Sequence, residues 1–410
     1  MTVNSLQTRE VSDLCIGKPA TRPLSLSATV GDALLALRSG GSDDRLVIWT
    51  ADGPAPERKA CAGNVCLVDV LCYLCSEQNL DCPMAALGAP ASALLPPLTA
   101  ASPVRRVDPS CRHASTLITP SRSFILEALD AILDGAQSLV VPIRAAASPR
   151  KFTSGSAAEL CWLTREDFVR FFLNSIALFS PVPALSVTDL GLVRPAALAV
   201  RPQDPALSAL PHIRAALAEQ TSVAVVSDDG RLIGEISPFT LAHCDERVAP
   251  ALAALSAGDL MTFVDCVGAP RKSAMRSIRA QLRAKGLLGM LELLDADVSP
   301  PFSPSTSSSE SDDESSPSSP ALSNGRGRPR VTRSAWRSGS YSARMGRRSE
   351  EAIVCHPWSS LVAVMIQALA HRVSYVWVVD DDDYYLDGIV TFSDILEVFR
   401  EQLEQTGTCI

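Results

Sequence analysis

Two segments of the chain place a threonine three residues before an aspartate, at a point where a short apolar run gives way to an amphipathic one. They are Thr164 with Asp167, and Thr391 with Asp394. If a helix begins there, its free N–H groups and positive dipole favour phosphate, and the carboxylate can accept hydrogen bonds from hydroxyl groups. The same spacing also forms a capping box, which contributes about 1 kcal/mol and requires no ligand. Both interpretations stay open from sequence.

Two other places in the chain hold half of this pair. Asp69 supplies the acid, but Cys66 stands where the hydroxyl would be. Ser237 supplies the hydroxyl, but Thr240 stands where the acid would be. At most three acids of this kind are therefore available, and only two of them belong to complete pairs.

Other kinds of site chemistry find little support in the sequence. It contains no G-x-x-x-x-G-K-[ST] loop, no G-x-S-x-G elbow and no H-E-x-x-H motif, and its five histidines are widely spaced. His371 and Arg372 end a predicted helix and could reach a phosphate, although cations are common at helix C-termini without ligands. Cys72 and Cys75 fall in a predicted helix, which favours buried reduced thiols over a metal site. We therefore expect a protein that is not an enzyme, with no metal and no required cofactor.

The elements that must position the Thr–Asp pairs are clearest near the end of the chain. Leu361 to Leu403 predicts a helix, a strand, a turn, a strand and a final helix. Tyr375 to Val379 is the apolar first strand, and Leu386 to Val390 returns as the second. Thr391 stands where the second strand passes into the final helix. Weaker copies of this order recur upstream, and the residues at the equivalent point are Thr164, Ser237 and Cys66.

Each upstream copy has its own pair of predicted strands. They are Leu46–Trp49 with Val65–Val68, Leu139–Ile143 with Leu160–Leu163, and Val223–Val226 with Leu232–Ile236. A unit of this size cannot bury its apolar face alone, so the copies should pair. Chance recurrence in an ordinary α/β protein is the alternative, and the shared T-x-x-D step argues against it.

The organisation of the chain follows from these copies and from its composition. Apolar residues make up 47% and charged residues 20% of the 410 residues, enough to build real cores. The net charge of −8 argues against a general nucleic-acid or membrane-surface binder. We expect repeats at 11–80, 104–180, 183–244 and 351–404, a helical insertion at 245–298, and a disordered linker at 299–350.

The repeated unit resembles the CBS domain, the β-α-β-β-α module first known from cystathionine β-synthase. Gly388 to Leu396 closely resembles the most recognisable stretch of that family, Leu163 to Phe168 resembles it moderately, and Leu232 to Ser237 matches its strand half. The resemblance implies an α/β fold of tandem CBS domains forming two CBS pairs, with helical and disordered insertions. It makes the chain similar to gamma subunits of AMP-activated and related plant-type protein kinases, and to free-standing plant CBS-pair proteins.

The resemblance also implies a function. Clefts between paired CBS domains often hold adenine nucleotides, with the hydroxyl on the phosphate side and the aspartate on the ribose. The residues carried over are Thr164, Asp167, Thr391, Asp394, Asp69 and Ser237, with AMP, ADP or ATP as a regulatory ligand. We expect a regulatory protein that transmits nucleotide occupancy to a partner, either a protein kinase or another regulated enzyme, and that could form a homodimer. A scaffold whose CBS pairs have lost their ligand is the alternative.

The linker at 299–350 carries two blocks of opposite charge. Serines precede acids in the first block, so kinases that prefer acidic substrates could phosphorylate Ser309 and Ser311, adding about −1.5 to −2 charge each. An unmodified solvating linker is the alternative. In the arginine-rich second block, Arg326 to Pro329 resembles the AT-hook core that enters A·T-rich minor grooves. A solvated linker or nuclear-import patch is favoured over this chromatin-associated role.

The sequence shows neither a secretory signal nor a membrane-spanning segment. Met1 to Leu14 lacks the pattern of a secretory signal, and no apolar run approaches the roughly 18 residues that span a bilayer. The expected location is cytoplasmic and/or nuclear, with no membrane partner.

Overall fold

The computed structural model of the chain describes Leu6 and residues 8–39, 44–49, 61–95, 124–143, 159–265, 272–296, 352–381 and 383–407. The predicted linker at 299–350, with Ser309, Ser311 and the R-G-R-P segment, lies outside these residues. Four small sheets organise the described part of the chain. We number the repeats 1 to 4 after these sheets.

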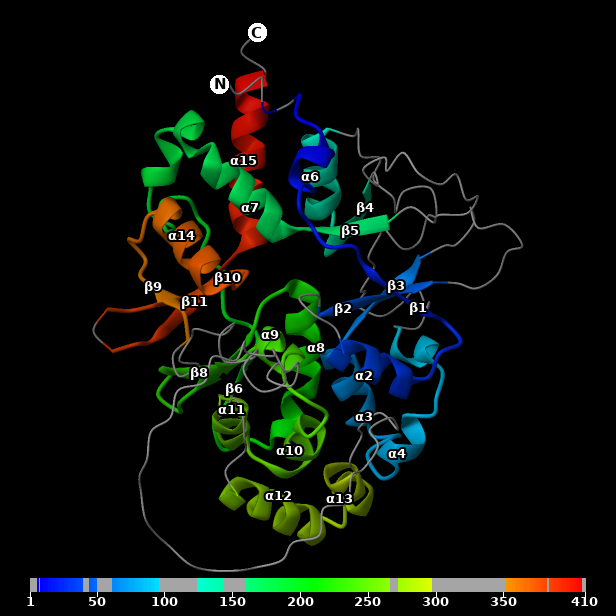
Figure 1. The fold of residues 1–410 in the computed structure, drawn as a ribbon. Coiled ribbons are helices and arrows are strands. Elements are labelled where there is room, and N and C mark those ends of the chain that lie inside the picture. Colours follow the sequence, from blue (N-terminus) through cyan, green and yellow to red (C-terminus); the bar gives the residue numbers. More distant parts are fainter. Residues whose placement is uncertain are drawn as a thin grey trace, which may run out of the picture. The chain divides into compact units, whose positions relative to one another are not determined.

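Three of the four sheets share one topology (Figure 1). In each, a first strand runs parallel to the second, and the second runs antiparallel to the third. These strands are β1 (Arg22–Ser25), β2 (Arg45–Trp49) and β3 (Cys61–Cys66) in repeat 1, β6 (Ala199–Val200), β7 (Val223–Val226) and β8 (Leu232–Ile236) in repeat 3, and β9 (Val354–Cys355), β10 (Tyr375–Val379) and β11 (Leu386–Thr391) in repeat 4. Repeat 2 has the antiparallel pair, β4 (Ser138–Ile143) with β5 (Glu159–Thr164).

Each antiparallel pair lies between two helices in sequence, which confirms the predicted α/β repeats. The helices are α2 (Val30–Ser39) and α3 (Leu67–Leu74), α6 (Ile125–Leu133) and α7 (Arg165–Asn174), α8 (Leu210–Glu219) and α9 (Pro238–Ala242), and α14 (Leu361–His371) and α15 (Phe392–Gly407). Their apolar positions recur at helical spacing and face the core, as Phe168 and Phe172 do in α7. Pro238 occupies a first-turn position of α9, where its missing N–H costs nothing.

One predicted boundary is wrong in repeat 1. The sequence predicted a strand at Val65–Val68, whereas β3 ends at Cys66 and α3 begins at Leu67. The cause is a capping box, since the backbone N–H of Cys66 donates to Asp69 Oδ2 at 2.9 Å and its thiol donates to the same oxygen at 3.3 Å. These bonds start the helix before the apolar run is over.

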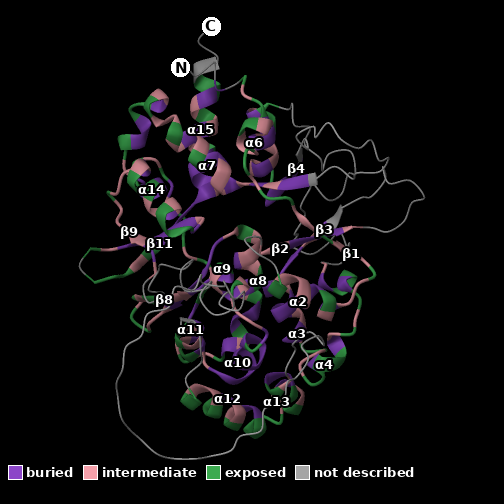
Figure 2. Cartoon of the chain, in the orientation of Figure 1, coloured by how far each residue is buried: buried purple, intermediate pink, exposed green. Residues whose placement is uncertain are grey.

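The repeats contact one another through both helices and sheets. Helix α7 packs against α14 and α15, so repeats 2 and 4 join by their helices, and α3 packs against α8 and α9, so repeats 1 and 3 do the same (Figure 1). In the first of these contacts, the rings of Phe172 and Phe399 stack at 4.8 Å. Trp162 of β5 packs with Val47 of β2, which joins the sheets of repeats 1 and 2. Most of the strand residues are buried as a result (Figure 2).

A buried polar contact joins the sheets of repeats 3 and 4. The hydroxyl of Tyr375 and the indole N–H of Trp377, both on β10, donate to Glu235 Oε2 on β8 at 2.9 and 2.7 Å. Both donors are almost completely buried. The carboxylate therefore satisfies two groups that have no access to water.

This contact predicts a loss of stability at alkaline pH. Burial and, to a lesser extent, the charge of Glu235 raise the pKa of Tyr375 well above its usual value of 10.0. The unfolded chain releases the proton near its ordinary pKa and the folded chain does so later. The resulting stability is therefore complete below about pH 10, and it is lost at about 1.4 kcal/mol per pH unit as pH rises toward the folded pKa. Urea unfolding from about pH 8 to 11 should show a shallower decline for Tyr375→Phe, and parallel curves would contradict this.

Helices follow repeat 3, where the sequence predicted a helical insertion. They are α10 (Val248–Ala254), α11 (Ala257–Asp265), α12 (Lys272–Ala284) and α13 (Leu288–Asp295). Helix α10 packs against α3, α11 against β8, and α13 against α4 (Pro83–Ala86). Glu246, just before α10, is buried and pairs with Arg38 of α2 at 2.9 Å. The insertion is thereby fastened to repeats 1 and 3.

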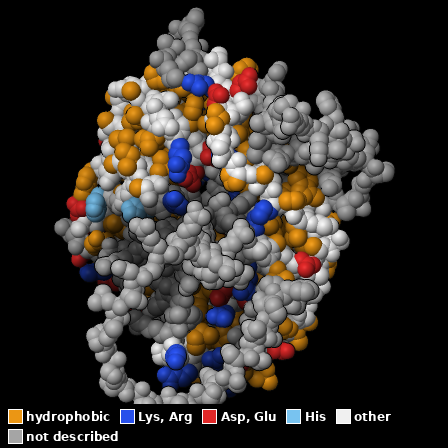
Figure 3. Space-filling view, in the orientation of Figure 1, with side chains coloured by type: hydrophobic (Ala, Val, Ile, Leu, Met, Phe, Trp, Pro, Cys, Tyr) orange, Lys and Arg blue, Asp and Glu red, His pale blue; other side chains and the backbone are white. Residues whose placement is uncertain are grey.

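The exposed side of α12 is basic. Lys272, Arg276 and Arg283 are exposed there, while Ile278 and Leu282 face the interior. Basic side chains are visible over this helix in Figure 3. None of the helices in the described residues has the length and apolar character that crossing a bilayer requires.

Short 3-10 helices and an N-terminal arm complete the fold. The 3-10 helices are η1 (Val11–Leu14), η3 (Ala91–Leu94), η4 (Ile176–Phe179), η5 (Val182–Ala184) and η6 (Ala206–Ala209). We call residues 9–21 the N-terminal arm. The sequence assigned most of it to repeat 1, but it contacts repeat 2: Ile125 N–H donates to Arg9 O at 3.0 Å, and Thr21 N–H donates to Leu160 O at 2.7 Å.

Candidate functional site

The structure places all four equivalent residues at the same point of the fold. Cys66, Thr164 and Thr391 end the last strand of their repeats, and Ser237 directly follows it. In each case the next residue begins a helix. Helix starts with free N–H groups therefore occur where the sequence predicted them.

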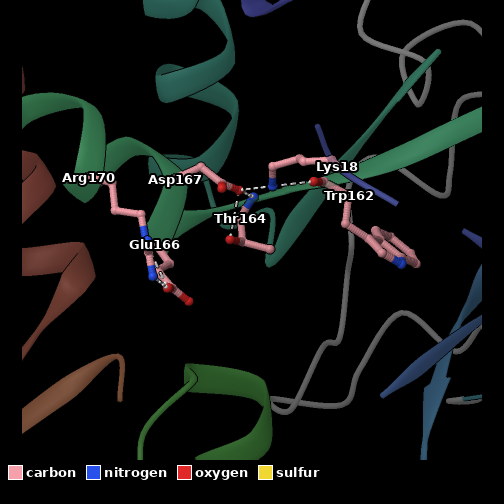
Figure 4. A network of polar contacts seen from close by, with 6 residues as sticks. All are labelled: Lys18, Trp162, Thr164, Glu166, Asp167 and Arg170. Carbon is pink, nitrogen blue, oxygen red and sulfur yellow. Dashed lines mark hydrogen bonds and ion pairs between the residues drawn. The ribbon is translucent and has the colours of Figure 1, made fainter. Parts of the chain in front are cut away.

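Thr164 and Asp167 form a complete capping box that also binds a cation (Figure 4). The backbone N–H and hydroxyl of Thr164 donate to Asp167 Oδ2 at 2.7 and 2.9 Å. Lys18 of the N-terminal arm donates to the same oxygen at 2.5 Å and to Trp162 O at 2.7 Å. The Glu166–Arg170 pair beside them is a separate contact along the helix. The carboxylate thus joins the arm to the start of α7.

Thr391 and Asp394 repeat this arrangement in a more buried place. The backbone N–H and hydroxyl of Thr391 donate to Asp394 Oδ2 at 2.9 and 2.7 Å. The other carboxylate oxygen, Oδ1, pairs with Nε of Arg194. The Asp394 side chain is only 3% exposed, whereas that of Arg194 is 55% exposed. A buried carboxylate is therefore held by a cation that reaches in from the surface.

The two incomplete pairs differ from each other. Cys66 and Asp69 still form a capping box, with a thiol in the hydroxyl's place. Ser237 is buried but caps no backbone N–H, and its oxygen lies 3.4 Å from the hydroxyl oxygen of Tyr375. Only the pairs of repeats 2 and 4 therefore combine a hydroxyl, a carboxylate and a cation. His371 and Arg372 are exposed at the end of α14.

Arg165, which no sequence pattern singled out, lies where the repeats meet. It is the first residue of α7 and is only 8% exposed. Its Nη1 donates to the carbonyl of Glu219, at the end of α8, at 3.2 Å, and its Nε has no hydrogen-bond partner among the described residues. Burial lowers the pKa of Arg165, the charge of Asp394 raises it, and Arg45 lowers it. An arginine remains charged in such surroundings, so the protein interior holds a cation here.

Side-chain amides and a hydroxyl connect three repeats around Arg165. Gln137 Nε2 donates to Ala218 O at 3.0 Å, and Gln220 Nε2 donates to Gln137 O at 2.7 Å. The hydroxyl of Ser374 donates to the carbonyl of Gln220. We call Gln137, Arg165, the chain end of α8 (218–220) and Ser374 the inter-repeat junction. It links repeats 2, 3 and 4 through the carbonyl end of α8, where positive charge is favoured.

Other segments of the protein pack closely against the last strand of each repeat. The close approach lies three residues before Cys66, Thr164, Ser237 or Thr391. A Cβ added to Gly388 would collide with Arg194 O, and one added to Gly234 would collide with Met261 Sδ. A Cβ added to Gly63 would lie 2.7 Å from Leu95 Cδ2. Three of the four repeats therefore have glycine at this close approach, and at Gly388 the neighbouring atom is backbone. Repeat 2 has Cys161 instead.

Lys18, Arg194 and Arg165 were all absent from the residues proposed on sequence grounds. Lys18 lies 149 residues from Asp167, and Arg194 contacts repeat 4 from the segment that precedes β6. Local spacing contains no signal for such contacts. Arg165 stands directly after Thr164, and a charged residue in a first helical turn is normally exposed.

Comparison with known proteins agrees with this architecture. The family model for the CBS domain matches residues 349–401, which cover most of repeat 4. The chain is 42% identical to the CBS domain-containing protein CBSX5 of Arabidopsis thaliana over 421 residues, covering 98% of each chain. It is 29% identical to CBSX6 of the same organism over 262 residues, which covers 62% of this chain and 54% of CBSX6.

A solved structure shares the fold at low sequence identity. It is a protein of Methanocaldococcus jannaschii described as an archaeal homolog of g-AMPK, with a TM-score of 0.53, 13% identity, and coverage of 95% of this chain and 100% of that one. The fold and site thus define a tandem CBS-domain protein. With near full-length similarity to CBSX5, the chain belongs to the family of CBS domain-containing proteins.

Proposed function

We propose that this chain is a non-catalytic regulatory protein that binds an adenine nucleotide and passes its occupancy to a partner protein. The observation that carries the proposal is the buried guanidinium of Arg165, whose Nε has no partner among the described residues and which interacts electrostatically with Asp394. A phosphate could accept from that N–H group, because guanidinium pairs well with phosphate oxygens. The choice of an adenine nucleotide as ligand rests on the resemblance to the CBS family, whose paired domains often bind such nucleotides.

The cations at the two complete Thr–Asp pairs would bind the phosphate groups of the nucleotide. Lys18 and Arg194 now neutralise Asp167 and Asp394. On ligand binding, each cation can turn to a phosphate. At Asp394 this frees Oδ1 to accept from ribose hydroxyls, whereas at Asp167 Lys18 leaves an oxygen, Oδ2, that still accepts from Thr164. The exchange replaces one set of charge-assisted bonds by another, so its net cost is small. Arg194 is more than half exposed, and its Nη2 also pairs with the exposed Glu397 at 3.5 Å, so its guanidinium is accessible from the surface.

The inter-repeat junction provides a route from ligand to partner. Arg165 holds the end of α8, and Ser374 holds the same segment from repeat 4. A ligand that draws Arg165 toward a phosphate would favour a different arrangement of repeats 2, 3 and 4. It can shift that equilibrium only by its difference in affinity for the two arrangements. The partner would be a kinase or another regulated enzyme that recognises one of them.

Calorimetric titration of the full-length protein with AMP, ADP and ATP tests this function. We expect saturable binding, and we expect Asp394→Asn to weaken it at least tenfold, about 1.4 kcal/mol, because the ribose acceptor becomes a poorer one. Asp167→Asn should weaken binding at its own site. Asp387→Asn is the matched control, since Asp387 is exposed on the same strand, β11. Absence of heat at millimolar nucleotide, with unchanged melting, would overturn the proposal.

A ligand-free scaffold is the second candidate function. The observation in its favour is that the capping boxes of Asp167 and Asp394 are complete, and each acid pairs with a cation, without any nucleotide. A partner recovered equally well with and without nucleotide, combined with no calorimetric binding, would support it.

A further inference from the structure

The N-terminal arm crosses strand β5 on both sides of Cys161. Lys18 Nζ donates to Trp162 O at 2.7 Å, and Thr21 N–H donates to Leu160 O at 2.7 Å. Cys15, at the end of η1, packs against the core cluster that contains Cys161. The two thiols interact with each other electrostatically, and both are free cysteines. Residues that are far apart in sequence thus bring two thiols together beside Lys18 and Asp167.

Cys161 stands at a position where the other repeats have glycine. It is equivalent to Gly63, Gly234 and Gly388, where neighbouring residues approach the strand closely. In repeat 2 the crossing chain is the arm, and the equivalent position carries a thiol. Cys161 is completely buried, whereas Cys15 is partly accessible.

The surroundings shift the pKa values of the two thiols in opposite directions. The hydrogen bond from Cys15, followed by the charge of Lys18, lowers the pKa of Cys161, against the opposing effects of burial and Asp167. The same hydrogen bond and burial raise the pKa of Cys15. Cys161 is therefore the better thiolate of the pair, and Cys15 is the more accessible thiol.

We propose that Cys15 and Cys161 are an oxidisable dithiol, and that a peroxide converts them to a disulfide that ties the N-terminal arm to β5. A thiolate attacks one peroxide oxygen, giving a sulfenic acid and, after protonation, one water. The second thiol attacks the sulfenic sulfur, the S–S bond forms, and a second water leaves. Two thiols are oxidised, hydrogen peroxide is reduced, and the two thiol hydrogens end in water.

The disulfide has a consequence for the neighbouring site, and this consequence rests on the proposed function. Lys18 is three residues from Cys15 and pairs with Asp167. With the arm tied to β5, Lys18 stays on the carboxylate, and the exchange that nucleotide binding needs at Asp167 is opposed. With the dithiol reduced, the arm can move away.

Peptide mapping of the full-length protein tests the dithiol directly. After hydrogen peroxide treatment and alkylation, we expect a linked peptide joining Cys15 to Cys161 that dithiothreitol abolishes. Cys82→Ser is the matched control, because Cys82 is an exposed cysteine outside the pair, and this variant should give the same linked peptide. Separate alkylation of Cys15 and Cys161 after peroxide would overturn the proposal, and so would a Cys15 linkage to another cysteine. This readout needs no nucleotide, so it is independent of whether the proposed function holds.

Hydrogen exchange of the arm amides tests the tether in the wild-type protein. Oxidation of the wild-type protein should slow exchange at Thr21, whose N–H donates to Leu160 O, by about tenfold. Cys15→Ser should remove this protection. Equal exchange before and after oxidation would show that no tether forms.

Discussion

Gly388→Ala should destabilise the folded protein by about 3 kcal/mol, which is at the upper end for added core volume. The new Cβ would collide with the backbone carbonyl of Arg194 and lie 2.8 Å from Val193 Cγ1. Arg194 and Ile389 exchange two backbone hydrogen bonds here, of 2.9 and 2.8 Å, so the obstructing atoms cannot retreat without breaking them. The same displacement would pull Arg194 away from Asp394.

Gly234→Ala is the matched control for this prediction. It is the equivalent glycine of repeat 3, but its Cβ would meet the sulfur of Met261 rather than backbone. A flexible thioether can move aside, so the expected loss is about 1 kcal/mol. Urea unfolding of the two variants compares them directly. Equal losses would mean that the crossing of β11 by Arg194 is not as tight as described.

Glu235→Ala should destabilise the protein by about 3–4 kcal/mol, because it leaves the buried hydroxyl of Tyr375 and the buried indole N–H of Trp377 without their acceptor. The variant would also loosen the contact between β8 and β10, and hence between repeats 3 and 4. A buried donor without a partner loses its full solvation, which explains the size of the effect.

Glu235→Gln shows whether the loss of stability comes from the missing hydrogen-bond acceptor or from any substitution at this residue. Glutamine keeps an acceptor oxygen at nearly the same place, so the loss should be about 1–2 kcal/mol. Thermal and urea unfolding of the full-length variants give both values. If alanine and glutamine proved equally damaging, hydrogen bonding to Tyr375 and Trp377 would not be the main contribution of this side chain.

Local sequence predicted the repeats well, because their signals are local. Strands Val223–Val226 and Leu232–Ile236 agree with β7 and β8 residue for residue. The apolar runs, the turn residues between them and the T-x-x-D step all act within a few residues. In repeat 1 the local signal misled, since Val65 to Val68 continues an apolar run across a helix start. There the capping bond between Cys66 and Asp69 decides the boundary.

The ion pairs of the site could not be predicted in this way. Asp167 was proposed from its spacing, but its cation comes from an arm 149 residues away, and nothing near either residue specifies the other. The burial of Arg165 could not be predicted from local sequence either. Its burial results from the packing of α7 against repeat 4 and from the position of the α8 end, both of which exist only in the folded chain.

The central claim is that the junction around Arg165 and the two complete Thr–Asp pairs form a nucleotide-responsive centre. A crystal structure of the full-length protein grown with AMP or ATP tests this most directly. We predict a nucleotide phosphate within hydrogen-bond distance of Arg165, Lys18 or Arg194, with its ribose on Asp167 or Asp394. A structure at saturating nucleotide in which both aspartates keep their present cation partners and no nucleotide lies beside them would contradict the claim.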